Sequence, residues 1–163
     1  MADPRSQSPQ SRKSKPARSL RARALALLAR SEHSRHELAQ KLAPFTEDSA
    51  EIPALLDDFE RRGWLSEERV VEQVVATRRR RFGAGRIAYE LRGKGISESA
   101  IAGAEVRLKE SELDAARAVW QRKFGKKAVG ASERARQIRF LQGRGFALET
   151  ALRVIKNAGN DDE

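Results

Sequence analysis

The sequence predicts an all-α protein of three tandem helical units that form an elongated, curved array. Leu, Ala, Arg and Glu dominate its 163 residues, and these residue types favour helices. Apolar residues recur three or four positions apart along most of the chain, as they do on one face of a helix. The stretch LRGKGIS at residues 91–97 returns as LQGRGFA at residues 141–147. A fixed period of about 50 residues is typical of helical repeats.

The chain begins with a segment that has too few apolar residues to join a core. Residues 1–17 are rich in Ser, Pro, Gln and basic residues, so we expect a disordered basic tail. The first helical unit is predicted over residues 18–63. One helix begins near Ser19, and a second begins at Ser34 and is stopped by a proline. A third helix covers about residues 52–62 and ends at a glycine.

The second unit is predicted over residues 64–109. Its first helix follows Ser66, which suits an N-cap because two glutamates come next, and it ends in a run of four arginines. A short helix is expected over about residues 84–92 and another over 97–108.

The third unit is predicted over residues 110–158. Its helices are expected at about residues 113–124, 132–142 and 147–157, because apolar residues follow helical spacing in each. The last of these helices is expected to direct three residues inward: Ala151, Leu152 and Ile155.

Two glycines surround one basic residue in each of the later units. We expect one glycine of each pair to take the left-handed backbone conformation that ends a helix, with the next apolar residue folding back onto the turn. The turn does not require the basic residue between the glycines. Lys94 and Arg144 are therefore predicted to face water and to be free to contact an anion.

The net charge of +10 is unevenly distributed along the chain. Residues 32–77 hold five bases and eleven acids, which predicts an acidic block over most of the first unit and the start of the second. Residues 78–94 hold seven bases and one acid, and residues 122–144 hold eight bases and one acid. Basic clusters of this kind favour a polyanionic partner, although solvated helix faces without a partner are the simpler alternative.

The candidate contact residues come from these basic clusters. Arginine pairs in a bidentate manner with carboxylates and phosphates, so the sequence does not choose between an acidic protein surface and DNA. An outward-facing tyrosine on the short helix is added, and a partly buried role for it is equally compatible with its spacing. The set is Arg78, Arg79, Arg80, Arg81, Arg86, Tyr89, Arg92, Lys94, Lys126, Lys127 and Arg144.

Other kinds of site find little support. GAGRIA at residues 83–88 has dinucleotide-motif spacing but follows TRRRRF, which is not a buried strand. His33 and His36 lack a third metal ligand nearby, and the chain has no cysteine. We therefore predict no enzymatic activity, metal or cofactor. No apolar run approaches the ~20 residues needed to cross a bilayer, so a cytoplasmic monomer without membrane contact is expected.

Several separated stretches resemble the RecX family of bacterial recombinase regulators. They are ALALLARSEHSRHELAQKL, LLDDFERRGWLSEERVVEQVV, RRFGAGRIAYELRGKGIS and IRFLQGRGFALETALRVI, in the order found here. The resemblance covers about residues 20–157. It implies three three-helix repeats and a non-enzymatic protein that binds the RecA recombinase and its filament on single-stranded DNA. Such proteins usually inhibit strand exchange, ATP hydrolysis and coprotease activity, in the setting of DNA repair and the SOS response.

Two other functions remain open from the residues themselves. A helical protein could bind DNA directly and act without RecA, in which case its DNA affinity would fall steeply with salt. A structural scaffold would show neither interaction.

Overall fold

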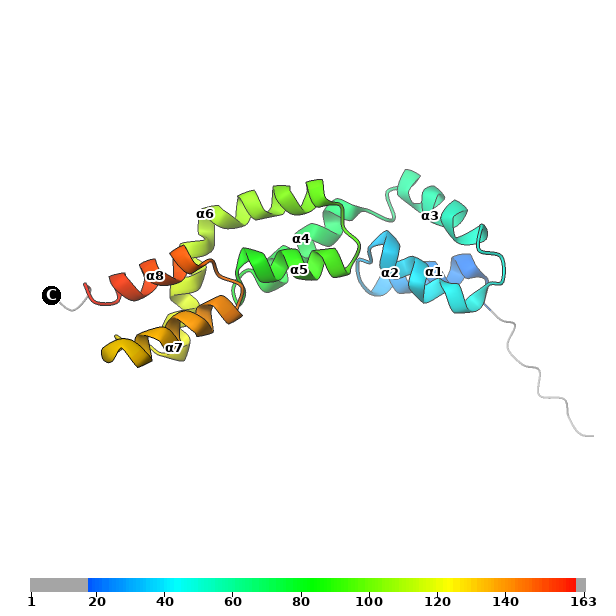
Figure 1. Ribbon diagram of the computed structural model, residues 1–163. Coiled ribbons are helices and arrows are strands. Elements are labelled where there is room, and N and C mark those ends of the chain that lie inside the picture. The colour runs from blue at the N-terminus through cyan, green and yellow to red at the C-terminus, as the bar shows by residue number, and fades with distance from the viewer. Residues whose placement is uncertain (1–17, 161–163) are drawn as a thin grey trace, which may run out of the picture.

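The computed structural model describes residues 18–160, which form an elongated row of helices (Figure 1). Within these residues there are eight α-helices and one 3-10 helix, η1, and no strand. The predicted all-α fold is thus confirmed, while the tail at residues 1–17 lies outside the described residues. The elements are α1 (Leu20–Arg30), α2 (Arg35–Leu42), η1 (Ala43–Phe45), α3 (Glu51–Arg61), α4 (Glu67–Arg78), α5 (Ala84–Gly93), α6 (Glu98–Lys123), α7 (Gly130–Gly143) and α8 (Leu148–Asn157).

Serine side chains cap the start of four helices. Ser19, Ser66 and Ser97 each accept a hydrogen bond from a backbone N–H in the first turn. Ser34 forms a capping box, because its side chain accepts from the Glu37 N–H while the Glu37 carboxylate accepts from the Ser34 N–H. Local sequence therefore sets where these helices begin.

Three separate hydrophobic cores follow one another along the row. The first lies among α1, α2 and α3 and includes Leu38 and Phe59, both fully buried. The second lies among α4, α5 and the first half of α6, around Leu91. The third lies among the second half of α6, α7 and α8, around Leu141. Each core is small, so each unit also depends on contact with its neighbour.

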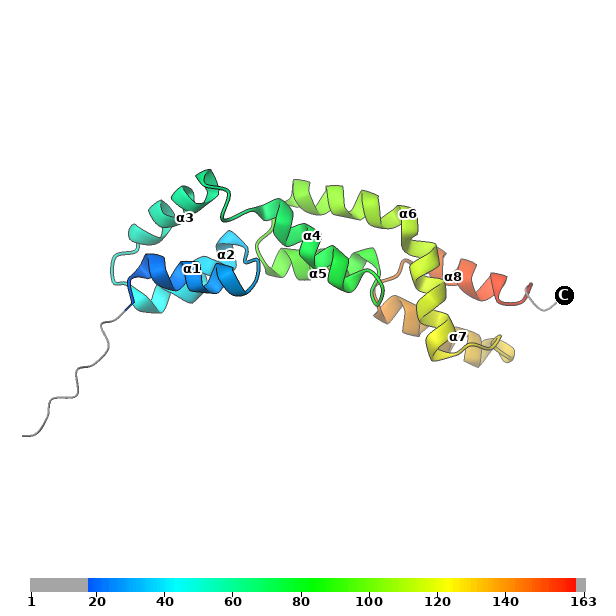
Figure 2. The same cartoon turned by 180° about the vertical axis from the view of Figure 1, so that it is seen from behind.

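Helix α6 differs from the prediction of two helices over residues 97–108 and 113–124. It is one 26-residue helix that bends partway along its length (Figures 1 and 2). Leu108 belongs to the second core and Ala116 to the third, so one helix serves both units. The polar residues between them interrupt the apolar stripe but are compatible with a helix. The predicted unit boundary at residues 109 and 110 falls inside α6, and the division into repeats remains a prediction.

The paired glycines form the turns after α5 and α7. Gly95 and Gly145 have φ angles of +74° and +90°, as expected for a left-handed helix end. The N–H of Ile96 donates to the Leu91 carbonyl at 3.1 Å, and Phe146 repeats this contact on the Leu141 carbonyl at 3.2 Å. Ile96 and Phe146 are buried, which confirms that the apolar residue folds back.

Each of these turns also contacts the short helix of the preceding unit. Gly95 lies against His36 at the start of α2, and Gly145 lies against Arg86 at the start of α5. The Ser34 hydroxyl donates to the Lys94 carbonyl, and the Gly83 N–H donates to the Arg144 carbonyl at 2.9 Å. Corresponding residues of the two joints are 50 positions apart, except that Ser34 and Gly83 are 49 apart. The repeat therefore encodes the joint as well as the turn.

The exposure of individual side chains settles two further expectations, for Leu152 and Tyr89. Leu152 was expected to face inward, but it is 38% exposed because Val154 fills the place beside Ile155. Of the two tryptophans, Trp120 is buried and Trp64 is exposed, with its ring centre 5.5 Å from that of Phe59. Tyr89 is 77% exposed, which confirms that it points outward.

Candidate anion-binding interface

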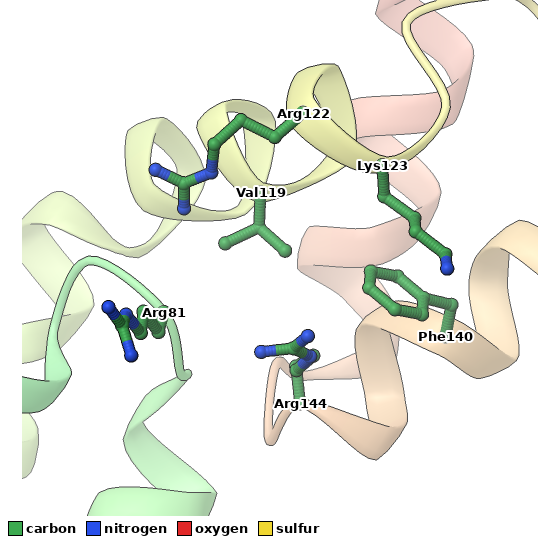
Figure 3. Close-up of a pocket in the computed structure, with 6 residues that line it drawn as sticks. All are labelled: Arg81, Val119, Arg122, Lys123, Phe140 and Arg144. Carbon is green, nitrogen blue, oxygen red and sulfur yellow. The ribbon is translucent and has the colours of Figure 1, made fainter.

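A basic depression lies where the second and third units meet. Its volume is about 460 Å³. It lies between the α4–α5 loop, the last turn of α6 and the end of α7 (Figure 3). Its lining consists of Arg81, Val119, Arg122, Lys123, Phe140 and Arg144. We refer to Arg81, Arg122, Lys123 and Arg144 as the basic cluster.

Three chain segments bring the basic cluster together. Arg81 lies in the loop just after α4, and Arg122 and Lys123 end α6. Arg144 lies at the end of α7, where its backbone carbonyl takes part in the joint with the second unit. Arg122 Nη2 donates to the Arg80 carbonyl at 2.8 Å and so ties α6 to the α4–α5 loop.

Two phenyl rings, Phe82 and Phe140, pack against cations in and beside the depression. The guanidinium carbon of Arg144 lies 5.4 Å from the centre of the Phe82 ring and 5.2 Å from that of Phe140. Lys123 Nζ lies 5.6 Å from the centre of the Phe140 ring, and Arg86 contacts the Phe82 ring at 4.7 Å. Cation–π contacts hold the charged groups in place without neutralising them.

The basic cluster has no carboxylate partner in the part of the chain that the structure describes. Within residues 18–160, none of its four members has a carboxylate oxygen within 4.0 Å, and no acidic residue lines the depression. Four like charges brought this close repel one another, and an anion placed among them relieves that repulsion. The arrangement therefore suits binding of phosphate or carboxylate groups, with arginine offering planar, bidentate donors.

Four of the predicted contact residues are engaged in contacts within the fold. Arg78 pairs with Glu90 at 3.1 Å, and Arg92 pairs with Glu98 at 2.9 Å. A hydrogen bond to Glu98 raises the pKa of Arg92 above its ordinary value. Arg79 Nη2 donates to the Ser111 hydroxyl at 3.1 Å, and Lys94 is the fourth member of this group.

The prediction that Lys94 faces water and is free to contact an anion is wrong. Its Nζ donates to a Glu37 carboxylate oxygen at 3.2 Å, and both side chains are about three-quarters buried. Burial acts to raise the pKa of Glu37, but hydrogen bonds from the Ser34 N–H and Lys94 outweigh it and lower that pKa overall. Lys94 therefore bridges the first and second units, whereas Arg144, its counterpart, joins the basic cluster.

The remaining predicted residues lie around the depression or away from it. Arg80 is exposed beside Arg81, and Arg86 is exposed over Phe82. Lys126 and Lys127 are exposed in the loop between α6 and α7. Tyr89 lies on the outer face of α5 and does not line the depression.

Sequence reasoning missed Arg122 and Lys123. Both fall in the basic segment of residues 122–144, but their place at the end of a helix is also where cations favour the helix dipole. Charge density alone was the available signal, and it did not separate them from other surface bases.

No metal site is formed by the residues that the structure describes. Among residues 18–160, no three His, Cys, Asp or Glu side chains lie close enough together to hold a metal ion. His33 is buried, with Nδ1 2.9 Å from the Ser31 carbonyl and Nε2 3.1 Å from Lys41 Nζ. His36 packs against Gly95 instead. None of the helices between residues 18 and 160 is long and apolar enough to span a membrane.

The fold and the interface define a class of all-helical tandem-repeat protein that presents a cationic surface at the joint between two units. Two family models match this chain: "RecX, second three-helix domain" over residues 66–104 and "RecX, third three-helix domain" over residues 110–155. The chain belongs to the RecX family.

Whole-length relatives and solved structures agree with this membership. The chain is 46% identical to "Regulatory protein RecX" of Leptothrix cholodnii over 91% of this chain and 95% of the relative. It is 44% identical to the protein of that name from Ralstonia nicotianae, over 86% and 88%. The crystal structure of RecX from Lactobacillus salivarius has the same fold, with a TM-score of 0.71 at 18% identity, covering 86% of this chain and 94% of that one.

Proposed function

We propose that this protein is a non-enzymatic regulator that binds RecA and the RecA filament on single-stranded DNA. Inhibition of the recombinase, ATPase and coprotease activities is the expected direction. The relatives' name, "Regulatory protein RecX", supports a regulatory role. The observation that carries the proposal is the basic cluster, whose four cations converge from three chain segments without an acidic partner among residues 18–160.

Occupancy of the filament is the proposed mechanism. An elongated row of units has the shape to contact several neighbouring RecA subunits, and the basic cluster supplies an anion contact along its length. The anion is either a carboxylate-rich patch on RecA or the phosphate backbone of the bound DNA. No covalent bond is made or broken, so regulation follows from where the protein sits and how that changes filament growth.

The test compares the RecA ATPase on single-stranded DNA with and without a charge-reversed basic cluster. We expect the natural protein to inhibit at amounts below one molecule per RecA, and Arg81→Glu/Lys123→Glu to inhibit at least tenfold less well. Lys109→Glu/Arg153→Glu is the matched control, since it makes the same change in net charge at exposed positions on α6 and α8. Equal inhibition by both double variants would remove the basic cluster from the mechanism.

Direct DNA binding without RecA is the second candidate function, and the same four cations favour it. Anisotropy of a labelled single-stranded oligonucleotide, measured over a range of salt, tests it. A RecA-independent DNA-binding protein would bind tightly at low salt and lose affinity by orders of magnitude as salt rises. If inhibition of RecA appears only when the protein itself has saturated the DNA, competition for DNA replaces the filament mechanism.

A further inference from the structure

A second basic surface lies at the far end of the row, in the first unit, where residues 18–63 hold eight bases and eight acids. A groove of about 250 Å³ runs between α1 on one side and α2 with η1 on the other. Half of its lining is basic and half is apolar, and no lining residue is acidic. The eight residues are Arg18, Arg23, Ala26, Leu27, Arg30, Lys41, Leu42 and Phe45. We call this surface the α1–α2 groove.

Three of the four apolar lining residues reach solvent, and only Leu42 is fully buried. Phe45 is 54% exposed, and Leu27 and Ala26 are half-buried on the face of α1 that lines the groove. Arg23 lies over the Phe45 ring at 3.9 Å, which holds the ring and one cation together. The groove thus combines a place for an apolar side chain with cations close beside it.

Comparison of the three units shows that this surface corresponds to the one that packs on the preceding unit in the later repeats. Phe45 comes three residues after Leu42, as Lys94 does after Leu91 and Arg144 after Leu141. In the two later units this position belongs to a turn that packs on the preceding unit. The first unit has no preceding unit within the described residues, so its η1 segment remains uncovered there.

Charge identifies the kind of partner that would cover it. At the joint between the first two units, the preceding unit supplies a carboxylate, Glu37, to the basic residue of the turn. At the α1–α2 groove the cations are Arg18, Arg23, Arg30 and Lys41, and within residues 18–160 none of them pairs with a carboxylate. An occupant with carboxylates beside an apolar side chain would complement this surface.

The chain's own N-terminal segment is a poor match for the groove. Residues 1–17 carry four bases and one acid, so their charge has the same sign as the rim of the groove. Nucleic acid would match the charge, but Arg23 already covers one face of the Phe45 ring, and the other apolar lining residues are aliphatic and offer no stacking surface for bases. We infer that the α1–α2 groove docks an acidic segment of a partner protein, anchored by one apolar side chain. This inference stands apart from the proposed function, because it uses other residues.

Selection from a displayed library of random 12-residue peptides tests the inference, with the full-length protein immobilised by its C-terminus. We expect enriched peptides to combine several Asp or Glu residues with a Leu, Ile, Phe or Trp. On Arg23→Glu/Arg30→Glu their recovery is expected to fall at least tenfold, whereas on Lys109→Glu/Arg153→Glu it is expected to be retained. Phe45→Ala tests the apolar anchor alone and is also expected to lower recovery, which keeps the test valid if the double variant does not fold.

Three outcomes would overturn the inference. One is the absence of any enriched peptide, and another is enrichment that is equal on the natural protein and on both groove variants. The third concerns an oligonucleotide of twenty thymidines. If it binds Arg23→Glu/Arg30→Glu at least tenfold more weakly than the natural protein, and no peptide depends on the groove, the groove would be assigned to nucleic acid. The RecA ATPase measured with Arg81→Glu/Lys123→Glu reports separately on the proposed function.

Discussion

Gly145 lies directly against Arg86, and this contact joins the third unit to the second. A Cβ atom at Gly145 would come within 2.5 Å of the Arg86 backbone nitrogen. Gly95 stands in the same relation to His36, where an added Cβ atom would meet the Cβ of the histidine at 2.6 Å. Glycine is required at each joint for two reasons: its φ angle is positive, and the preceding unit approaches too closely to leave room for a Cβ atom.

Replacing Gly145 by alanine is therefore expected to destabilise the third unit. The left-handed conformation alone costs a residue with a Cβ about 1–2 kcal/mol, and the clash with Arg86 adds to that. We expect a loss of about 2 kcal/mol or more in the free energy of unfolding. Urea unfolding followed by Trp120 fluorescence in a Trp64→Phe background measures it in the third unit.

Gly143→Ala is the matched control for this prediction. Gly143 belongs to the same glycine pair, but its φ angle is not positive and an added Cβ meets nothing within 4 Å. Because alanine favours a helix, this variant is expected to be neutral or slightly stabilised. Equal losses in the two variants would show that the joint does not depend on the approach of Gly145 to Arg86.

The sequence accounts well for the turns and less well for what the turns contact. The spacing of Leu141, Gly143, Gly145 and Phe146 follows from the chemistry of a helix end, which is local. The packing of Gly145 on Arg86 is a contact between residues 59 positions apart, and no local rule contains it. The continuity of α6 was also missed, because its apolar stripe moves from one core to the next partway along.

The Glu37–Lys94 pair is expected to make stability depend on pH. The pKa of Glu37 is lowered in the folded protein, since the Ser34 N–H and Lys94 outweigh the opposing effect of burial. A carboxyl group with a lowered pKa stabilises the fold above its unfolded pKa, about 4.3, and that stabilisation is lost as pH falls through the folded value. The difference in unfolding free energy between the natural protein and Glu37→Gln should therefore shrink below about pH 5.

At pH 7 we expect Glu37→Gln to cost about 1 kcal/mol, because it weakens the capping box and removes the ion pair. Urea unfolding at pH 7, 5, 4 and 3 measures both effects. Glu110→Gln is the control, since Glu110 is exposed on α6. A difference between the natural protein and Glu37→Gln that stays constant from pH 7 to pH 3 would rule out the ion pair as its source.

Gln137 is a buried polar residue that no sequence motif indicated. Its side-chain oxygen accepts from Trp120 Nε1 at 2.9 Å, and its side-chain nitrogen donates to the Lys126 carbonyl at 3.2 Å. Gln137→Ala would leave the indole N–H without this partner and open a cavity, so we expect a loss of about 2–4 kcal/mol. Urea unfolding measures it, and exposed Gln142 on the same helix provides the control, Gln142→Ala, which is expected to change little.

The basic cluster shows where prediction of the site reached its limit. Arg81 and Arg144 were identified because each lies in a basic run of the sequence. Arg122 and Lys123 reach them only because α6 continues past the predicted boundary and brings its last turn beside the α4–α5 loop. Charge density can locate basic segments. Whether a basic side chain pairs with an acidic one or stays unpaired depends on the fold.

Arg78 and Arg81 are therefore expected to behave differently although they belong to one run of arginines. Arg78 joins α4 to α5 through Glu90, with contacts at 3.1 and 3.4 Å, whereas Arg81 faces the depression. Arg78→Ala should lower the unfolding free energy by up to about 1 kcal/mol and leave inhibition of the RecA ATPase unchanged. Arg81→Ala should leave stability unchanged and weaken inhibition several-fold. Glu90→Gln should reproduce the effect of Arg78→Ala, and weakened inhibition by Arg78→Ala at unchanged stability would contradict this division of roles.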